Sequence, residues 1–268
     1  WLVIDDGSTD GTEEYLAGIA ALHPGLVRYE TTPNGGKHRA LNRGAVLAQG
    51  EWVMVVDSDD WLTDDGIKTV LSITFSLGQA ENIAAIFGLH KIKGQGSQKY
   101  FHVSKNPCQY HEWLAQQKKF DVCMVLKRDF LIKEPFPSVP KENFMAETWL
   151  CLRIDRASNK VYFANKCLTH VEYQLGGLSS LNDQLRAISP VSAMIVYYEV
   201  IRSRLPGPFI WKAKVNFWRY RWHAHFRRHH CPEMPYPSLI YAFLALPLFL
   251  FDLWKIRVNV RKKAHVVR

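Results

Sequence analysis

The 268-residue sequence predicts an α/β domain with a mostly parallel sheet flanked by helices, followed by a helical C-terminal extension. In the early part of the chain, short apolar runs alternate with segments of helical periodicity, which is typical of parallel sheets. Hydrophobic residues make up 47% and charged residues 22%, a balance that excludes a disordered polyelectrolyte. Charge is uneven, because 1–199 hold 20 lysines and arginines against 23 acids, whereas 200–268 hold 14 against 2. We therefore predict a domain over 1–205 and a basic aromatic tail over 206–268.

The first elements are set by apolar runs and the turns that end them. We expect strands over 1–4, 26–29 and 51–56, and helices over 12–22 and 37–48. Aspartate clusters follow the first and third strands, at 5–6 and 57–60. Ligands of α/β sheets bind beyond the carboxyl ends of strands, so both clusters are expected at the ligand-binding edge.

Later elements have weaker boundaries. Helical spacing predicts helices over 67–77, 144–154 and 184–204, and apolar runs predict strands over 83–92, 121–126 and 160–163. A turn is expected over 94–97 and an irregular loop over 135–140. Pro206-Gly207-Pro208 ends the last of these helices and marks the domain boundary.

The tail combines aromatic and basic residues at helical spacing. One face carries Trp211, Val215, Trp218, Trp222 and Phe226, with lysines and arginines on either side. This pattern predicts a helix at a membrane surface. Residues 239–251 are uncharged but fall short of the roughly 20 residues of a span, so we favour an in-plane or re-entrant segment. Residues 211–263 are thus expected to meet an anionic membrane; the alternative is a tail packed on the domain or on a second subunit.

Cysteine usage and the start of the chain give two further expectations. The five cysteines are widely spaced with no Cys-x-x-Cys pair, which favours reduced thiols in a cytosolic protein over a zinc site. The chain begins at Trp1 inside an apolar strand, without Met or a leader, which indicates that earlier residues are missing.

Asp57-Ser58-Asp59-Asp60 is the most informative motif. Clustered carboxylates repel one another, and a hard divalent cation such as Mg²⁺ or Mn²⁺ relieves that repulsion. Such a metal can grip a diphosphate and stabilise its charge as it leaves. The alternative is a solvated turn that caps the following helix.

Two glycine-containing motifs precede helices. In Asp5-Asp6-Gly7-Ser8 a carboxylate can accept hydrogen bonds from a nucleobase or ribose, although a strand-to-helix turn explains the pattern equally well. Asn34-Gly35-Gly36-Lys37-His38-Arg39 combines glycines, a helix N-terminus and cations, which suits an anion. It lacks the spacing of a Walker loop, and its alternative is a turn with solvated charges.

Together the three motifs, in this order and spacing, strongly resemble family 2 glycosyltransferases of the GT-A fold. The resemblance covers roughly residues 1–200 and is most specific in the first sixty. The opening strand of the family is absent, which supports an N-terminal truncation. The resemblance implies a nucleotide-sugar site and a metal site, with the roles distributed as follows: Asp6 on the base, Asp59 with Asp57 on the metal, Asp57 and Ser58 near ribose and donor sugar, and Lys37 and Arg39 on the nucleotide.

The family also uses a carboxylate base, commonly in a Glu-Asp pair before a helix that ends in Arg-Leu. Counting back from Arg153, Glu147 falls on the base position, whereas Ala146 replaces the preceding acid. The stretch from Phe120 through Phe136, Glu147 and Glu172-Tyr173 to Gly177-Leu178-Ser179 resembles a bacterial polysaccharide-type subgroup with Glu at the base position. The alternative for Glu147 is a helix N-terminal acid favoured by the dipole. His170 follows a strand, where a structural histidine is favoured over a ligand.

These expectations combine into one reaction. The resemblance implies an inverting, metal-dependent glycosyltransferase that moves a sugar from a UDP-linked donor to a saccharide or polyprenyl-linked acceptor. We expect it in the cytoplasm, peripheral on the inner face of the cell membrane. The alternatives are a sugar-phosphate nucleotidyltransferase and a non-catalytic membrane- or nucleic-acid-binding module. No recognised nucleic-acid motif is present, so no nucleic-acid partner is expected.

Overall fold

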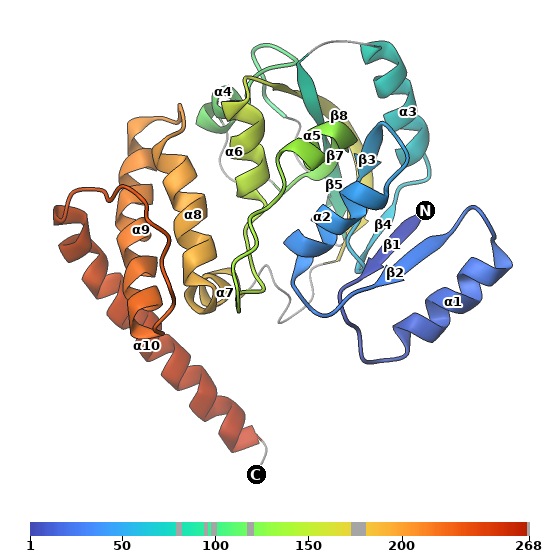
Figure 1. Ribbon diagram of the computed structural model, residues 1–268. Helices are drawn as coiled ribbons and strands as arrows, with labels where there is room; N and C mark the ends of the chain where they lie inside the picture. The colour runs from blue at the N-terminus through green and yellow to red at the C-terminus, as the bar shows by residue number, and fades with distance from the viewer. Residues whose placement is uncertain (79–81, 94–95, 98–100, 117–120, 173–180, 267–268) are drawn as a thin grey trace.

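The computed structural model describes residues 1–78, 82–93, 96–97, 101–116, 121–172 and 181–266, with side chains for all of these except 96–97 and 256–266. The predicted α/β fold is confirmed. A two-stranded sheet lies at one side of the molecule, a six-stranded sheet occupies the middle, and the C-terminal helices lie at the opposite side (Figure 1). Residues 94–95 of the expected turn lie outside the described residues, as do Phe120, Tyr173 and Gly177-Leu178-Ser179 of the subgroup resemblance.

The small sheet follows the predicted strand–helix alternation. Strand β1 (Leu2–Asp5) pairs in parallel with β2 (Arg28–Thr31), and α1 (Thr12–Leu22) connects them. Helix α2 (Lys37–Leu47) follows β2 and packs beside β1. These four elements lie within a few residues of the predicted boundaries, and they bring the carboxyl end of β1 close to the N-terminus of α2.

The large sheet is mixed, whereas the sequence predicts a mostly parallel one. Its order is β3-β7-β5-β8-β4, with β6 on the edge of β5, and only β5 and β8 pair in parallel. The strands are β3 (Trp52–Met54), β4 (Asp60–Leu62), β5 (Ile83–Ile92), β6 (Gly96–Ser97), β7 (Cys123–Lys127) and β8 (Lys160–Val171). The difference arises because the regular alternation of strand and helix, which forces parallel crossovers, holds only before β3.

Several helices differ from the prediction. The expected helix over 184–204 is two helices, α7 (Asn182–Ile188) and α8 (Pro190–Ile201), because a proline cannot continue a helix through its missing N–H. Helix α6 (Thr148–Arg156) begins after Glu147 rather than at 144. Two short helices, α4 (Tyr110–Gln116) and α5 (Arg128–Lys133), were not expected, whereas α3 (Gly66–Leu77) was.

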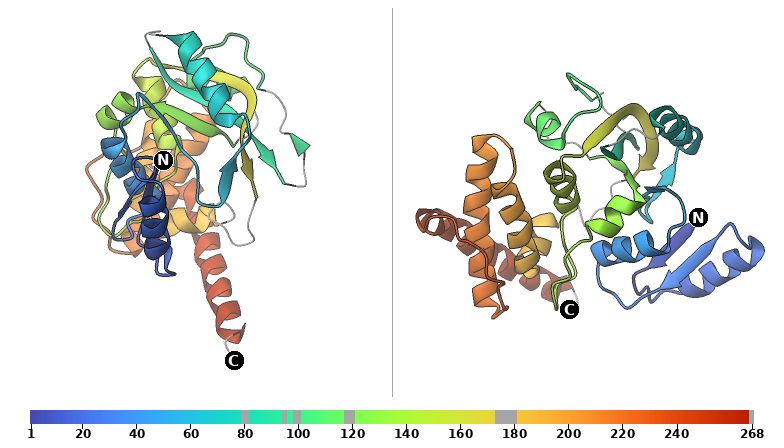
Figure 2. Two further views of the ribbon diagram at one scale, coloured as in Figure 1. Left: turned by 90° about the vertical axis from the view of Figure 1, so that its right-hand side faces the viewer. Right: turned by 45° about the horizontal axis from the view of Figure 1, so that its top comes forward.

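Both faces of the large sheet are covered by apolar side chains. Phe87 of β5 and Phe163 of β8 pack with Trp113 of α4 on one face. Ile86 of β5 and Leu168 of β8 belong to the cluster on the other face, which includes residues of α3. Successive residues of β5 therefore enter different cores, as the two-residue repeat of a strand requires. Figure 2 shows helices on both sides of this sheet.

The C-terminal helices form a third core. Helix α9 (Gly207–Phe226) packs against α8 and against α10 (Ile240–Val266). Val215 and Trp218 of the expected membrane-facing stripe are buried in this core, whereas Trp211 and Phe226 are exposed. The stripe is therefore mainly a packing face of the protein, which corrects the expectation for α9. In the part of the chain that the structure describes, no helix has the length and apolarity needed to cross a membrane.

Candidate active site

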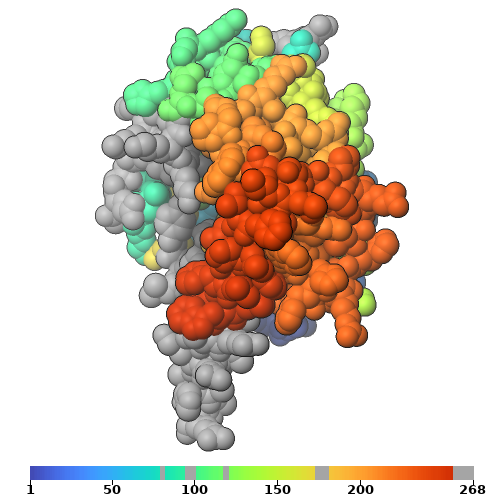
Figure 3. Space-filling model, turned by 90° about the vertical axis from the view of Figure 1, so that its left-hand side faces the viewer, coloured from blue at the N-terminus to red at the C-terminus, as the bar shows by residue number. Residues whose placement is uncertain are grey.

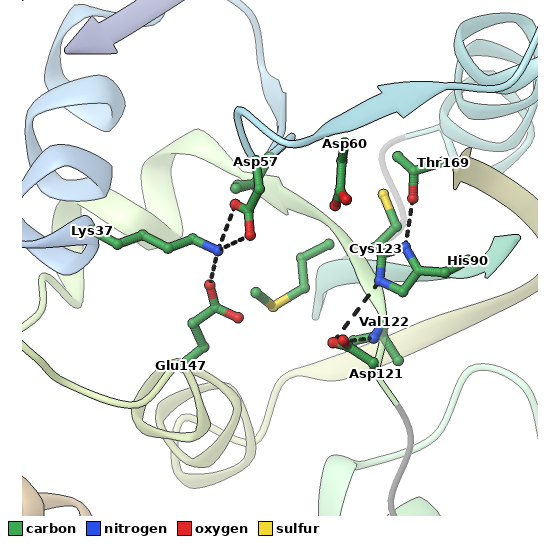
Figure 4. Close-up of a pocket in the computed structure, with 11 residues that line it drawn as sticks. Lys37, Asp57, Asp60, His90, Asp121, Val122, Cys123, Glu147 and Thr169 are labelled. Carbon is green, nitrogen blue, oxygen red and sulfur yellow. Dashed lines mark hydrogen bonds and ion pairs between the residues drawn. The ribbon is translucent and has the colours of Figure 1, made fainter. Parts of the chain in front are cut away.

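Three charged residues from separate segments meet at one pocket (Figure 4). Lys37 opens α2, Asp57 lies after β3, and Glu147 is the residue before α6. The Lys37 Nζ lies 2.5 Å from Oδ1 of Asp57 and 2.6 Å from Oε1 of Glu147. The structure thus brings together the expected base, one residue of the acidic motif and one residue of the glycine-rich motif.

The pocket holds more negative charge than Lys37 alone compensates. Burial lowers the pKa of Lys37, but the carboxylates of Glu147 and Asp57 outweigh that effect and raise it above its ordinary value. Burial, together with the charges of Asp57, Asp59 and Asp121, raises the pKa of Asp60 to about 6. Lys37 therefore remains charged at neutral pH.

The far wall of the pocket contains polar residues from β5, β7 and β8. The Nδ1 of His90 lies 2.6 Å from the hydroxyl of Thr169, and its Nε2 lies 3.9 Å from a carboxylate oxygen of Asp121. Burial lowers the pKa of His90, against the opposing influence of Asp121. Burial also raises the pKa of the Cys123 thiol to about 12, so the thiol is not ionised at neutral pH. Neither group supplies a second positive charge or a thiolate nucleophile.

Asp6 anchors the glycine-rich motif. Its two carboxylate oxygens accept hydrogen bonds of 2.7 Å from the backbone N–H groups of Gly35 and Gly36. Gly36 has a φ of +89°, and a Cβ there would lie 1.8 Å from the carbonyl oxygen of Asn143. The position therefore requires glycine. This packing brings together the end of β1, the start of α2 and the segment before α6, on which the positions of Lys37 and Glu147 depend.

Arg39 holds the 138–143 segment. Its guanidinium donates hydrogen bonds to the carbonyl groups of Gly35, Val139 and Glu142, and its Nε donates to the hydroxyl of Ser138. The sequence indicates a nucleotide contact at this position. In the structure the guanidinium is already occupied by protein oxygens, and Arg39 does not line the pocket.

Ser58 and Asp59 lie in the exposed turn between β3 and β4 and do not line the pocket. Asp59 is nonetheless close enough to raise the pKa of Asp60. Among the described residues, no group of three or more histidine, cysteine or acidic side chains forms a ready metal site. The ring of His170 is stacked on Trp61 with centroids 5.4 Å apart, outside the pocket.

Sequence reasoning did not identify His90, Asp121 and Thr169, which form the far wall of the pocket. His90 and Asp121 carried a usable signal, since each is a polar residue in a mainly apolar run that predicts a strand. Thr169 carried none, because β8 extends beyond its predicted end and the hydroxyl enters the pocket only through pairing of β8 with β5.

Comparison with known proteins confirms the resemblance. Residues 1–110 match the model of glycosyl transferase family 2. Chondroitin synthase of Pasteurella multocida is 36% identical over 69 residues, which are 26% of this chain and 7% of that protein. TuaG of Bacillus subtilis, a glycosyltransferase named for teichuronic acid biosynthesis, is 24% identical over 75% of this chain and 76% of its own length.

The fold has a counterpart among solved structures. Residues 1–349 of S. aureus TarS in complex with UDP-GlcNAc give a TM-score of 0.56 at 15% identity, covering 84% of this chain and 63% of that one. The chain therefore spans less than two thirds of TarS 1–349 and a small part of chondroitin synthase. The similarity to TarS establishes a shared fold.

Proposed function

We propose, from the match of residues 1–110 to glycosyl transferase family 2, that this chain transfers a sugar from a nucleotide-diphosphate sugar to an acceptor hydroxyl. The observation that carries the proposal is the meeting of Glu147 with Asp57 and Lys37 in one pocket. Glu147, the carboxylate that would act on the acceptor, therefore lies opposite Asp57, where the donor would bind. We further propose a UDP-linked donor, a choice that is supported by the complex of TarS with UDP-GlcNAc.

The base role of Glu147 follows from its position. A general base must be ionised and within reach of the acceptor hydroxyl. Glu147 is half-exposed at the pocket, and its carboxylate is paired with the ammonium of Lys37. Deprotonation of the acceptor by Glu147 would direct attack on the sugar from the face opposite the leaving group, which gives inversion.

The residues beside the pocket also suit a divalent cation. Asp57, Asp59 and Asp60 offer hard oxygen ligands, and burial, followed by the neighbouring carboxylates, raises the pKa of Asp60. Asp59, with Asp57, would hold Mg²⁺ or Mn²⁺. When bound, such an ion neutralises charge on a leaving diphosphate. Lys37 supplies a positive charge of its own at the same place.

The remaining proposals concern the donor pocket and the acceptor. Asp6 holds Gly35 and Gly36, so the backbone of this loop is set beside the donor site. We assign Asp6 and Ser58 to the nucleotide and donor sugar, and Arg39 to the support of the loop on which the nucleotide rests. The acceptor would be a saccharide or a polyprenyl-linked saccharide, reached at the cytoplasmic face of the membrane.

The test is a nucleotide-release assay on the full chain with UDP-, GDP- and TDP-sugars, with and without Mn²⁺, and with membrane extract as the acceptor source. Asp59→Ala and Glu147→Gln are compared with Asp129→Asn, an exposed acid on α5 away from the pocket. We expect Mn²⁺-dependent UDP release that only the first two variants lose.

Three outcomes would contradict parts of the proposal. Release of pyrophosphate instead of UDP would identify a nucleotidyltransferase. Full activity of Glu147→Gln would move the base elsewhere. Absence of both turnover and calorimetric nucleotide binding would remove the donor site itself.

A further inference from the structure

The two long sides of α10 have different surroundings. Ala242, Ala245, Phe249 and Asp252 are buried, and the first two belong to the core shared with α8 and α9. Asp252 accepts hydrogen bonds from Arg219 of α9, and one of its carboxylate oxygens lies 2.9 Å from Nε2 of His223. This side fixes α10 on the protein and sets which residues face outward.

The outward side of α10 is apolar. Its members recur at three- and four-residue spacing opposite the buried ones, and their exposed fractions range from 47% to 77%: Ile240, Phe243, Leu244, Leu250, Phe251 and Trp254. We call these six residues the α10 apolar face. Figure 3 shows α10 at the molecular surface beside α9. A contiguous apolar face of this kind that is exposed to solvent marks a site of interaction.

Exposed cations accompany the α10 apolar face in the same part of the chain. Arg227 and Arg228 are exposed and directly follow Phe226 at the end of α9, and the ring centroid of Phe226 lies 6.2 Å from that of Phe249 on the buried side of α10. Lys255 is exposed one position after Trp254. Residues 200–268 hold 14 lysines and arginines against only two acids, of which Asp252 is already paired within the protein. The part of the chain that carries the apolar face is therefore strongly cationic.

An exposed apolar face together with nearby cations favours an anionic lipid surface over a second copy of the chain as the binding partner. A second copy of the chain would place one cationic region against another, which is unfavourable. An anionic lipid surface would satisfy the charge and accept the apolar side chains at the boundary between headgroups and acyl chains. Because its opposite side is buried against the protein, α10 would lie in the membrane plane.

We propose that the α10 apolar face docks the protein on an anionic lipid bilayer, with Arg227, Arg228 and Lys255 contacting the headgroups. In this assignment α10, rather than α9, is the lipid-facing helix. The link between membrane docking and a lipid-linked acceptor rests on the proposed function, whereas binding of α10 to the bilayer does not.

The test is flotation of the purified full chain, without nucleotide, with vesicles of phosphatidylcholine alone or with added phosphatidylglycerol, at low and high salt. We expect flotation only with phosphatidylglycerol, weakened by salt. The double variant Phe243→Asp with Phe251→Asp should lose binding by a factor of at least about ten, because two large apolar side chains no longer enter the bilayer. Arg227→Gln with Arg228→Gln should reduce the preference for phosphatidylglycerol.

The matched control is Phe75→Asp, which replaces a Phe that is 90% exposed on α3, far from α10 in sequence. It should float like the unaltered protein, and thermal unfolding should show that all variants are folded. Equal loss in the control, or equal binding to phosphatidylcholine alone, would overturn the proposal. The proposal would also be overturned if the protein did not float with any vesicles and instead formed a dimer that the double variant Phe243→Asp with Phe251→Asp dissociates. A failure of the membrane-docking proposal would leave nucleotide release measured without vesicles unchanged. The docking proposal and the proposed glycosyl transfer can therefore be tested separately.

Discussion

The Nζ of Lys37 lies 2.6 Å from Oε1 of Glu147, so an ion pair joins the start of α2 to the start of α6 across the pocket. The same ammonium contacts Asp57, which places one cation between the proposed base and the acidic turn after β3. The arrangement has a simple consequence. Changes at Lys37 should affect both the donor and the acceptor side of the proposed reaction.

Replacing Lys37 by Met should lower kcat/KM for UDP release by at least about tenfold, since two carboxylates lose a charge-assisted partner. Lys37→Arg should retain part of the activity. The comparison variant is Lys127→Met, because Lys127 contacts Trp52 and Glu51 away from the pocket. Steady-state kinetics measure the effect, and unchanged kinetics in Lys37→Met would show that the ion pair has no part in turnover.

Glu147→Asp should separate catalysis from helix capping. Aspartate is a good residue at the start of a helix, so thermal stability should be kept or raised. The shorter side chain withdraws the carboxylate from the acceptor, so turnover should fall by about a hundredfold, within the range of general-base effects. Unfolding and nucleotide release are measured on the same preparation. Full turnover with altered stability would assign Glu147 to the helix terminus alone.

Arg39→Met should destabilise the fold by about 2 kcal/mol, because several buried or half-buried oxygens lose a charged donor. Urea denaturation measures this change. Arg43→Met, which removes a surface pair with Glu30, should have little effect. If Arg39 instead acted mainly on the nucleotide, donor affinity would fall while stability stayed the same.

His38 should make the fold sensitive to acid. Burial, followed by the charge of Arg39, lowers the pKa of His38 to about 4 from its ordinary 6.5. The unfolded chain therefore binds this proton first, so stability is full above pH 6.5 and falls as pH decreases towards 4. The shift corresponds to at most about 3 kcal/mol. Urea denaturation between about pH 4 and pH 7.5 should show a smaller acid loss in His38→Leu than in the unaltered chain, and parallel curves would contradict the assignment.

Asp252→Asn should weaken the attachment of α10 to α9 by about 3–5 kcal/mol, because Arg219 would be left as a buried charge without its acid. The double variant Asp252→Leu with Arg219→Met should recover much of that loss. Thermal unfolding measures both. A double variant as unstable as Asp252→Asn would mean that packing, rather than charge, sets the cost.

The amino-acid sequence by itself determines most of what local patterns encode. The alternation of apolar runs and helical segments predicts β1, α1, β2 and α2, and the order and spacing of three motifs predict the family. Lys37 and Asp57 are also identifiable from the sequence through their motifs, whereas Glu147 is identified through the family resemblance.

What the tertiary structure decided is which of these residues meet and which surfaces remain open. The mixed pairing of the large sheet, the pocket wall formed by His90 and Thr169, and the use of Arg39 as a support all depend on strands and loops distant in sequence. Val215 and Trp218 of the α9 stripe are buried and the α10 apolar face is exposed because α8 and α10 pack on α9. Periodicity shows that a helix has an apolar face, but only packing determines whether that face is buried in the protein or exposed at its surface.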